Sequence, residues 1–228
     1  MIAKVASCAV VGLDALPIGV EIDVANGLPA MIVVGLPDKA VQESRERVRS
    51  AIVSTGVMLP AKRIVVNLAP ADLPKAGPAY DLPIAVGILA GLGVVPPVEP
   101  DWLFLGELAL DGELRHTTGV LPMVILARDQ GYKKVFLPAV NAPEASLIQG
   151  VEIMGLESLE QLIHYLHGGE SINPLPGADF ASLQEKQTYE HDMSWVKGQE
   201  QVKRVLEIAV AGGHNLSLIH ISEPTRPY

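Results

Sequence analysis

The sequence of 228 residues is poor in cysteine, in aromatic residues and in positive charge. Cys8 is the single cysteine, so no disulfide can form within the chain, which fits a reducing, cytoplasmic compartment. Aromatic residues make up 4% and hydrophobic residues 49%, so we expect a core built mainly from Val, Ile, Leu and Ala. The formal net charge of −9 argues against a sequence-independent grip on nucleic acid by this region, because phosphate binding needs a basic face.

Targeting, membrane and metal-binding patterns are also lacking. The first five residues do not have the charged-then-apolar pattern of a signal peptide. Residues 82–98 form the longest uncharged run, but prolines and glycines interrupt it, so it predicts a core helix and a loop and no membrane span. His164 and His167 lie one turn apart without a cysteine or a second histidine pair, so we expect ordinary histidines and no metal site.

Hydrophobic periodicity predicts strands and helices up to about Gly169. The expected strands are Lys4–Val11, Ile18–Val24, Ala30–Val34, Lys62–Asn67, Trp102–Leu110, Glu113–Arg115, Lys134–Leu137 and Val151–Met154. The expected helices are Lys39–Ser54, Leu82–Ala90, Gly119–Gln130, a short helix from Asn141, and Ser158–His167. The Asn26-Gly27 turn predicts that Ala30–Val34 folds back as an N-terminal β-hairpin. The mixture of hairpins and βαβ units predicts one α/β (α+β) domain over residues 1–169.

Residues 39–54 are expected to form an amphipathic helix that Asp38 caps. The apolar face carries Val41, Val48 and Ile52. On the other side, Glu43 and Arg47 are one turn apart and are expected to pair. The helix also carries three arginines, Arg45, Arg47 and Arg49. These arginines either contact a phosphate or form an ordinary solvated helix face.

The chain is organised around residues 67–91, which read NLAPADLPKAGPAYDLPIAVGILAG. A β-rich segment leads into a loop of prolines and small residues, and the loop opens a helix. We expect Asp81 to be the N-cap and Pro83 to lie in the first turn, where a missing N–H is harmless. The helix interior is apolar all round and should be buried. This loop is either a rigid connection or a site.

The loop resembles the nucleophile loop of the Lon protease family, in which a serine follows Gly-Pro. Pro74, Lys75, Gly77 and Pro78 carry the resemblance, and Ala79 occupies the serine position. Residues 106–114, GELALDGEL, resemble the Lon hairpin that precedes the catalytic lysine. The lysine position then falls on Leu121, or on Pro122 with a one-residue slip.

A Ser–Lys dyad needs a hydroxyl and an amine within hydrogen-bond reach. Ala79 and Leu121 supply neither, so we expect no catalytic residue in this loop. The chain up to about residue 215 therefore resembles the YifB/ComM family of magnesium-chelatase-like AAA+ ATPases, which has a non-proteolytic Lon-like N-terminal domain. The resemblance implies the Lon proteolytic-domain-like fold, which is similar to the second domain of a ribosomal protein and contains a left-handed βαβ unit.

The resemblance also implies a division of the chain into four parts. Residues 1–169 correspond to the Lon-like domain, 170–190 to a linker and 191–215 to the start of the ATPase module. In that module Val196, Gly198 and Gln199 would lie on the adenine side of the nucleotide, and residues 200–211 are expected to form a helix. Residues 216–228 look like a translated sequencing adapter, with prolines where the family expects a glycine-rich phosphate loop.

By resemblance, the full-length protein would be a hexameric, ATP- and Mg²⁺-dependent DNA motor that promotes branch migration in natural transformation. Alternatives are an ATP-dependent Lon-like peptidase and a magnesium chelatase subunit. The pattern GxxxxGK[ST] does not occur in this sequence, so we expect this chain itself to bind no ATP tightly. We expect no membrane partner.

Overall fold

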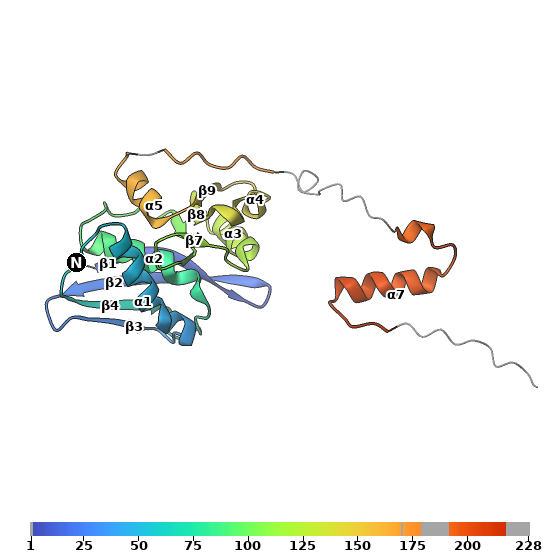
Figure 1. Cartoon of the computed structure of the whole chain (residues 1–228), viewed down its shortest axis with the longest axis horizontal. Coiled ribbons are helices and arrows are strands. Elements are labelled where there is room, and N and C mark those ends of the chain that lie inside the picture. Colours follow the sequence, from blue (N-terminus) through green and yellow to red (C-terminus); the bar gives the residue numbers. More distant parts are fainter. Residues whose placement is uncertain (1, 170, 179–191, 218–228) are drawn as a thin grey trace, which may run out of the picture. The chain divides into compact units, whose positions relative to one another are not determined.

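The computed structural model describes residues 2–169, 171–178 and 192–217 (Figure 1). The chain divides into two compact units, residues 1–184 and 185–228. The strands of the first unit are β1 (Ile2–Val11), β2 (Asp14–Ala25), β3 (Ala30–Val34), β4 (Arg63–Ala69), β5 (Trp102–Phe104), β6 (Glu107–Leu108), β7 (Leu114–Arg115), β8 (Lys134–Pro138) and β9 (Glu152–Leu156). Its helices are α1 (Lys39–Ser54), α2 (Asp81–Gly91), α3 (Val120–Asp129), α4 (Ala142–Ala145) and α5 (Leu159–Leu166), with 3₁₀ turns at Pro78–Tyr80 and Ala139–Asn141.

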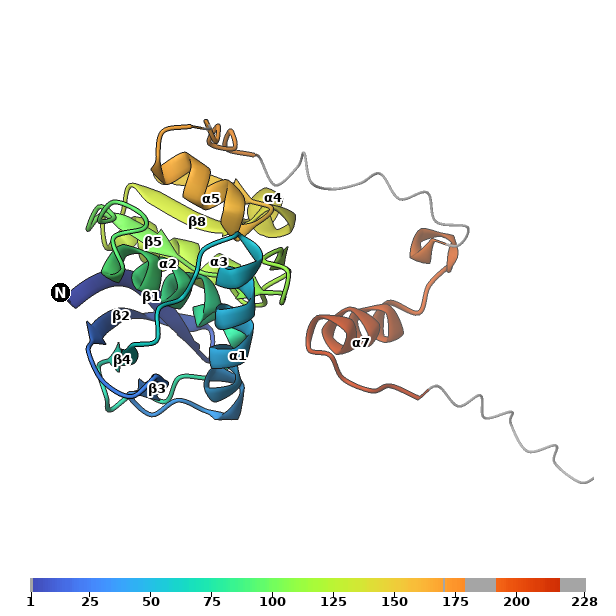
Figure 2. The same ribbon diagram turned by 60° about the vertical axis from the view of Figure 1, so that its left-hand side comes forward.

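Seven strands form one mixed sheet in the order β3-β4-β2-β1-β5-β8-β9, and Figure 2 shows the run from β3 to β8. β6 and β7 form a separate two-stranded sheet. The pairs β1–β2 and β2–β4 are antiparallel, and the other pairs in the large sheet are parallel. The parallel strands β3 and β4 are consecutive in the chain and are connected through α1. The mixed α/β class predicted from the sequence is confirmed.

Neighbouring residues of β5, β8 and β9 point to opposite faces of the sheet, and both faces are buried there. Phe104, Phe136 and Met154 join the apolar cluster that α1, α2 and α5 help to form. Leu103, Val135 and Ile153 join a second cluster with residues of α3 and α4. In β2 and β4, by contrast, buried residues alternate with half-buried or exposed ones, so only one face of these strands is buried. This end of the sheet therefore packs on one side, as period-two alternation predicts.

The N-terminal hairpin differs from the prediction. The hairpin is β1–β2, and it turns at Gly12, where φ is +67°. The strand after Asn26-Gly27 does not return to β2, because β4 lies between β2 and β3. The physical reason is burial: β4 contributes three buried apolar side chains to the core, whereas β3 contributes none that is fully buried. The strand with more surface to bury takes the position with two neighbours.

The strand predicted over residues 102–110 is also interrupted. β5 ends at Phe104 and β6 begins at Glu107. Between them, the Gly106 N–H donates to the Ala79 carbonyl at 2.9 Å, and its carbonyl accepts from the Leu82 N–H at 3.0 Å. The backbone of Gly106 is therefore bonded to the start of α2 and does not continue the ladder. The predicted hairpin at Asp111-Gly112 is confirmed as β6–β7.

α2 lies close against the sheet and is buried over most of its length, as its all-round apolar sequence predicts. Gly87 permits this approach, because a Cβ at that position would lie 2.6 Å from Cγ1 of Ile22 in β2. Gly35 plays a similar role after β3: its φ is +101°, and a Cβ would lie 2.2 Å from the Leu68 carbonyl oxygen. These two contacts bring the central loop and helix into a fixed position over the sheet.

Residues 171–178 belong to the first unit and pair in part with β9, since the Leu175 N–H donates to the Ile153 carbonyl at 2.9 Å. Residues 170 and 179–190 of the predicted linker lie outside the described residues. In the second unit, a 3₁₀ turn at Met193–Trp195 precedes α7 (Glu200–Ala211), whose bounds equal those predicted. Most of the predicted adapter, residues 218–228, also lies outside the described residues. None of the described helices is long and apolar enough to cross a membrane.

Candidate functional site

The central loop and the segment before α3 line one cavity of about 340 Å³. Gly77, Pro78 and Ala79 form one side of it. The other side includes Glu107, His116, Thr117, Thr118 and Met123. Ala79, which the resemblance aligns with the Lon serine, therefore lies in the cavity wall. The residue is 7% exposed.

The loop is held by the segment that leads into α1. The Lys75 N–H donates to the Leu36 carbonyl at 3.2 Å, and the Asp38 N–H donates to the Lys75 carbonyl at 2.9 Å. The carboxylate of Asp38 accepts from the Val41 N–H at 2.7 Å and from the Gly77 N–H at 3.2 Å. Asp38 is thus the helix cap that the sequence predicted, and it also ties the loop to the helix.

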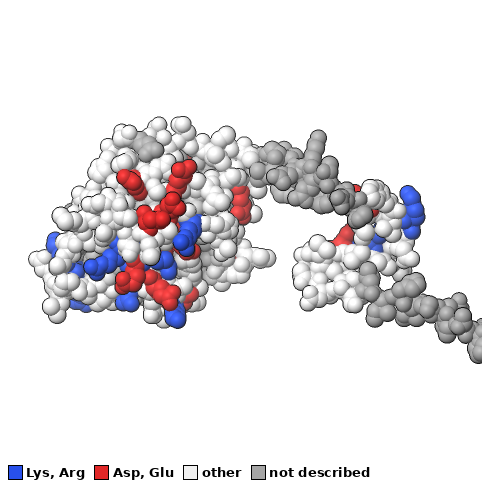
Figure 3. Space-filling view, viewed as in Figure 1, with Lys and Arg blue, Asp and Glu red and all other residues white. Residues whose placement is uncertain are grey.

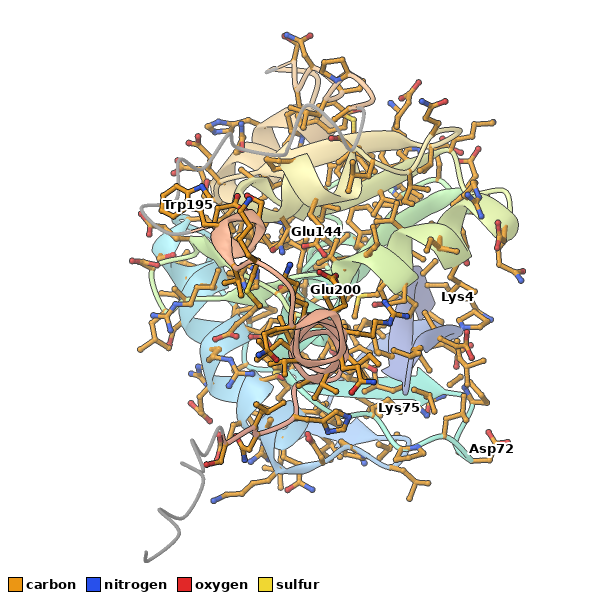
Figure 4. The ribbon with its side chains drawn as sticks, turned by 90° about the vertical axis from the view of Figure 1, so that its right-hand side faces the viewer. Lys4, Asp72, Lys75, Glu144, Trp195 and Glu200 are labelled. Atoms are coloured by element: carbon orange, nitrogen blue, oxygen red, sulfur yellow. The ribbon has the colours of Figure 1, made fainter. Side chains whose placement is uncertain are left out.

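Lys75 points into the loop and does not line the cavity. Its side chain is buried, and its ammonium group donates to the Pro70 carbonyl. Burial lowers the pKa of Lys75, and the charge of Asp72 partly opposes this. Figure 4 shows Asp72 at the outer end of the loop and Lys75 closer to the body of the domain. The amine is therefore a structural element of the loop, away from the wall that holds Ala79.

Asp81 is not the N-cap of α2. The 3₁₀ turn at residues 78–80 runs directly into the helix, so Asp81 already has helical dihedral angles and Tyr80 is the cap residue. The buried carboxylate of Asp81 instead accepts from Arg47 Nε at 2.7 Å, from an Arg47 terminal nitrogen at 3.0 Å and from the Leu108 N–H at 3.2 Å. Burial raises the pKa of Asp81, and the bonds from Arg47 and Leu108 oppose that rise.

The predicted Glu43–Arg47 pair is therefore wrong. The Arg47 guanidinium binds the buried Asp81 with two charge-assisted hydrogen bonds, which is a stronger interaction than an exposed pair one turn apart. Glu43 pairs with Lys39 at 3.8 Å. Of the three arginines on α1, Arg45 and Arg49 are exposed. Only these two therefore lie on a solvated helix face, and Arg47 does not.

Asn141 holds the other side of the cavity. Its side-chain oxygen accepts from the Thr117 N–H at 2.9 Å, and its side-chain nitrogen donates to the Thr117 carbonyl at 2.9 Å. Asn141 is 1% exposed, so this pair of hydrogen bonds is sheltered from water. The sequence pattern did not indicate this contact, because nothing local marks an asparagine that bonds a backbone 24 positions away.

The predicted dyad positions lie in different surroundings. Leu121 is half-buried in the first turn of α3 and does not line the cavity, whereas Thr118 and Met123 do. The Thr117 hydroxyl accepts from the Glu107 N–H and donates to the Arg115 carbonyl, both at 3.4 Å. The cavity thus contains hydroxyl and imidazole groups beside the alanine, and the predicted lack of a catalytic dyad stays a prediction.

No group of three metal-ligating side chains occurs in the part of the chain that the structure describes. In the second unit, Val196, Gly198 and Gln199 are exposed just before α7. Gly198 and Gln199 both have positive φ values, +69° and +58°, so they form a turn that opens the helix. These three residues alone do not enclose a nucleotide.

Comparisons with known proteins place this mixed α/β domain in a family. The family described as "Subunit ChlI of Mg-chelatase" matches residues 20–141, and "Magnesium chelatase, subunit ChlI" matches residues 192–222. The chain is 42% identical to Uncharacterized protein YifB of Escherichia coli over 212 residues, which is 92% of this chain and 41% of YifB. It is 39% identical to Competence protein ComM of Haemophilus influenzae over 219 residues, which is 94% of this chain and 42% of ComM.

A shorter similarity relates the chain to DNA repair protein RadA of Bacillus subtilis, with 30% identity over 92 residues, or 40% of this chain and 20% of RadA. The first family match covers more than half of the chain, which defines a protein of the magnesium chelatase ChlI class. Within that class the chain belongs to the YifB/ComM family, as the resemblance indicated. The chain spans about two fifths of the length of the curated relatives it matches.

Proposed function

We propose that this chain is the N-terminal part of an ATP-dependent DNA-processing protein of the YifB/ComM type. The observation that carries the proposal is the order of the two family matches: a ChlI-type segment at residues 20–141 precedes a second at residues 192–222. The relatives' names, competence protein and DNA repair protein, support a role in DNA processing. The full-length protein would be a cytoplasmic homo-hexamer that moves along DNA during branch migration.

In this proposal, residues 1–169 form the Lon-like domain with its left-handed βαβ unit, and the domain has no protease activity. Ala79 at the serine position and the burial of Lys75 away from the cavity support it. Residues 170–190 are the linker and residues 191–215 begin the nucleotide-binding module. Residues 216–228 are proposed to be an adapter, although the second family match includes residues 216–222, so sequencing the gene beyond Asn215 is the direct test.

ATP and Mg²⁺ are proposed as cofactors of the full-length protein. Val196, Gly198 and Gln199 would supply only the adenine side of the site, and the sequence has no phosphate loop. We therefore expect this chain to bind ATP weakly, and we assign no step of hydrolysis to its residues. Titration calorimetry with ATP and Mg²⁺ tests this, and micromolar affinity for the chain would contradict it.

The DNA-motor proposal is tested on the full-length gene product. ATP hydrolysis is measured with and without single-stranded DNA, and unwinding is measured on a forked duplex. We expect DNA to stimulate hydrolysis and ATP to drive unwinding, while a non-hydrolysable ATP analogue should not support unwinding. A protein that neither unwinds the fork nor responds to DNA is not a motor of this kind.

A peptidase is the second candidate, because the cavity beside Ala79 holds the hydroxyls of Thr117 and Thr118 and the imidazole of His116. We expect casein and a fluorogenic peptide to remain intact with the purified chain. Cleavage that is lost in Thr118→Val or Lys75→Ala would establish a peptidase instead. The family name also suggests a magnesium chelatase subunit, and we expect no insertion of magnesium into protoporphyrin when partner subunits are added.

A further inference from the structure

β3 presents an open, uncharged edge. It is the first strand in the sheet order, and among the described strands it pairs only with β4. All five of its residues are apolar, and Ile32 and Val34 are 36% and 41% exposed. Edge strands in natural proteins usually carry lysine, proline or a bulge that prevents another strand from pairing. β3 has none of these within its length, so its backbone is available to an extended chain.

A cavity of about 200 Å³ adjoins the first residues of β3. Met31 of β3, Ile64 of β4 and Ile88 of α2 contribute apolar walls. Arg49 of α1 and Lys62 of the loop before β4 also line it. The lining contains no aspartate or glutamate, so this cavity is positively charged in a chain whose net charge is −9.

Both cations are exposed, and neither forms an ion pair with a described residue. Figure 3 shows Lys and Arg side chains, with Asp and Glu among them, over α1 and the adjoining part of the sheet. A negatively charged group of a ligand could therefore bind these two cations without first breaking an ion pair to another described residue.

The geometry of a sheet connects the edge to the cavity. Met31 lies opposite Ile64 in the β3–β4 register, and both side chains pack with the core on the α1–α2 face. A strand added to the outer edge of β3 would place every second side chain on that same face. One such side chain, next to Met31, would reach the cavity, and the side chain two positions along the added strand, on the same face, would reach Arg49 and Lys62.

The size and lining of the cavity identify the ligand chemistry. A volume of about 200 Å³ is below the usual 300–1,000 Å³ of a small-molecule site, so it suits one side chain. Its lining holds no aromatic ring on which a nucleic-acid base could stack. We infer that the β3 edge and this cavity bind an extended acidic peptide, with an aliphatic side chain in the cavity and a carboxylate against Arg49 and Lys62. This inference does not depend on the proposed DNA function.

The test uses the 228-residue chain and two fluorescein-labelled octapeptides. The acidic peptide reads Leu-Thr-Glu-Thr-Leu-Thr-Glu-Thr, so that leucine and glutamate alternate along one face of the strand, and the basic one has lysine in place of each acid. We expect the acidic peptide to give a saturable rise in anisotropy below about 1 mM and the basic one to give none. The double variant Arg49→Glu, Lys62→Glu should weaken binding by at least about tenfold.

Two controls match these changes. Lys4→Glu with Lys133→Glu makes the same change of net charge at two exposed lysines elsewhere, which pair with Glu21 and Asp101. We expect this double variant to bind within about twofold of the original chain. Ile32→Glu should abolish binding by placing a charge on the edge strand, whereas Leu13→Glu, at a residue 94% exposed in the β1–β2 turn, should not. Circular dichroism establishes that each variant is folded.

Each other outcome overturns the inference. Equal binding of both peptides removes the role of the cations, and binding unchanged in Ile32→Glu removes the role of the edge. A single-stranded 20-mer of DNA that displaces the peptide and loses affinity in the Arg49, Lys62 double variant would assign the site to nucleic acid. A dimer that Ile32→Glu dissociates, measured by sedimentation, would assign the edge to a second copy. Absence of binding up to about 1 mM refutes the inference outright.

Discussion

Replacing Arg47 with leucine is expected to leave the Asp81 carboxylate buried with little support. The Asp81 side chain is 0% exposed and that of Arg47 is 20% exposed. Arg47 is its charged partner and donates two hydrogen bonds to this carboxylate, at 2.7 and 3.0 Å, so only the neutral donors Ser44 and the Leu108 N–H, the latter at 3.2 Å, would remain. Removing one partner of a buried ion pair costs about 3–5 kcal/mol. This is a large share of the roughly 5–15 kcal/mol that stabilises a typical domain.

The loss is expected to depend on pH. Burial raises the pKa of Asp81 in the folded chain, and removal of Arg47 should raise it further. A carboxyl group with a raised pKa keeps its proton in the folded state after the unfolded state has lost it. Stability therefore falls as pH rises from the unfolded value, about 3.9, towards the folded one. The difference between Arg47→Leu and the original chain should be smallest near about pH 4 and largest near about pH 7.

Urea unfolding followed by circular dichroism at several pH values measures this difference. Asp81→Asn added to Arg47→Leu should recover part of the loss, because it removes the unpaired charge. Arg45→Leu is the matched control: Arg45 is exposed on the same helix, and we expect a change within about 0.5 kcal/mol. A loss below about 1 kcal/mol for Arg47→Leu, or a loss that is the same at every pH, would refute this reasoning.

Three further predictions concern buried groups. Ser7→Ala should raise the free energy of unfolding by about 1 kcal/mol, since the buried Ser7 hydroxyl has no hydrogen-bond partner among the described residues; a lower urea midpoint would contradict this. Asn141→Ala should cost about 2–3 kcal/mol and speed amide exchange at Thr117, because two buried hydrogen bonds are lost; unchanged exchange would count against it. Burial raises the pKa of Cys8 to about 12, so a thiol reagent at neutral pH should label Cys8 only after urea unfolds the chain.

Local signals in the sequence predicted most of the elements correctly. Asp38 caps α1, and the predicted bounds Lys39–Ser54 are those of the helix. The helix predicted over residues 158–167 is α5, and its first predicted residue, Ser158, is the cap and accepts from the Gln161 N–H. Such predictions succeed because a cap and a helical face depend on residues only a few positions apart.

The candidate site was predicted only in part. The loop that contains Ala79 was found from its own sequence, and the structure places this loop in the wall of a cavity. The opposite wall was not found, because it depends on Asn141 holding Thr117. The role of Asp81 was misjudged for the same reason: its partner Arg47 is 34 positions away in the chain. No periodicity within either helix records such a contact.

The sequence by itself determined the α/β class, the position of most helices and the loop that carries Ala79. Only the tertiary structure decided that β4 lies between β2 and β3, which leaves β3 at the edge. Only it decided that an arginine of α1 joins a carboxylate of α2. Strand order depends on how much apolar surface all the elements bury together. Buried ion pairs depend on which polar groups that packing removes from water. Neither the total buried surface nor the set of buried polar groups is a property of a single segment.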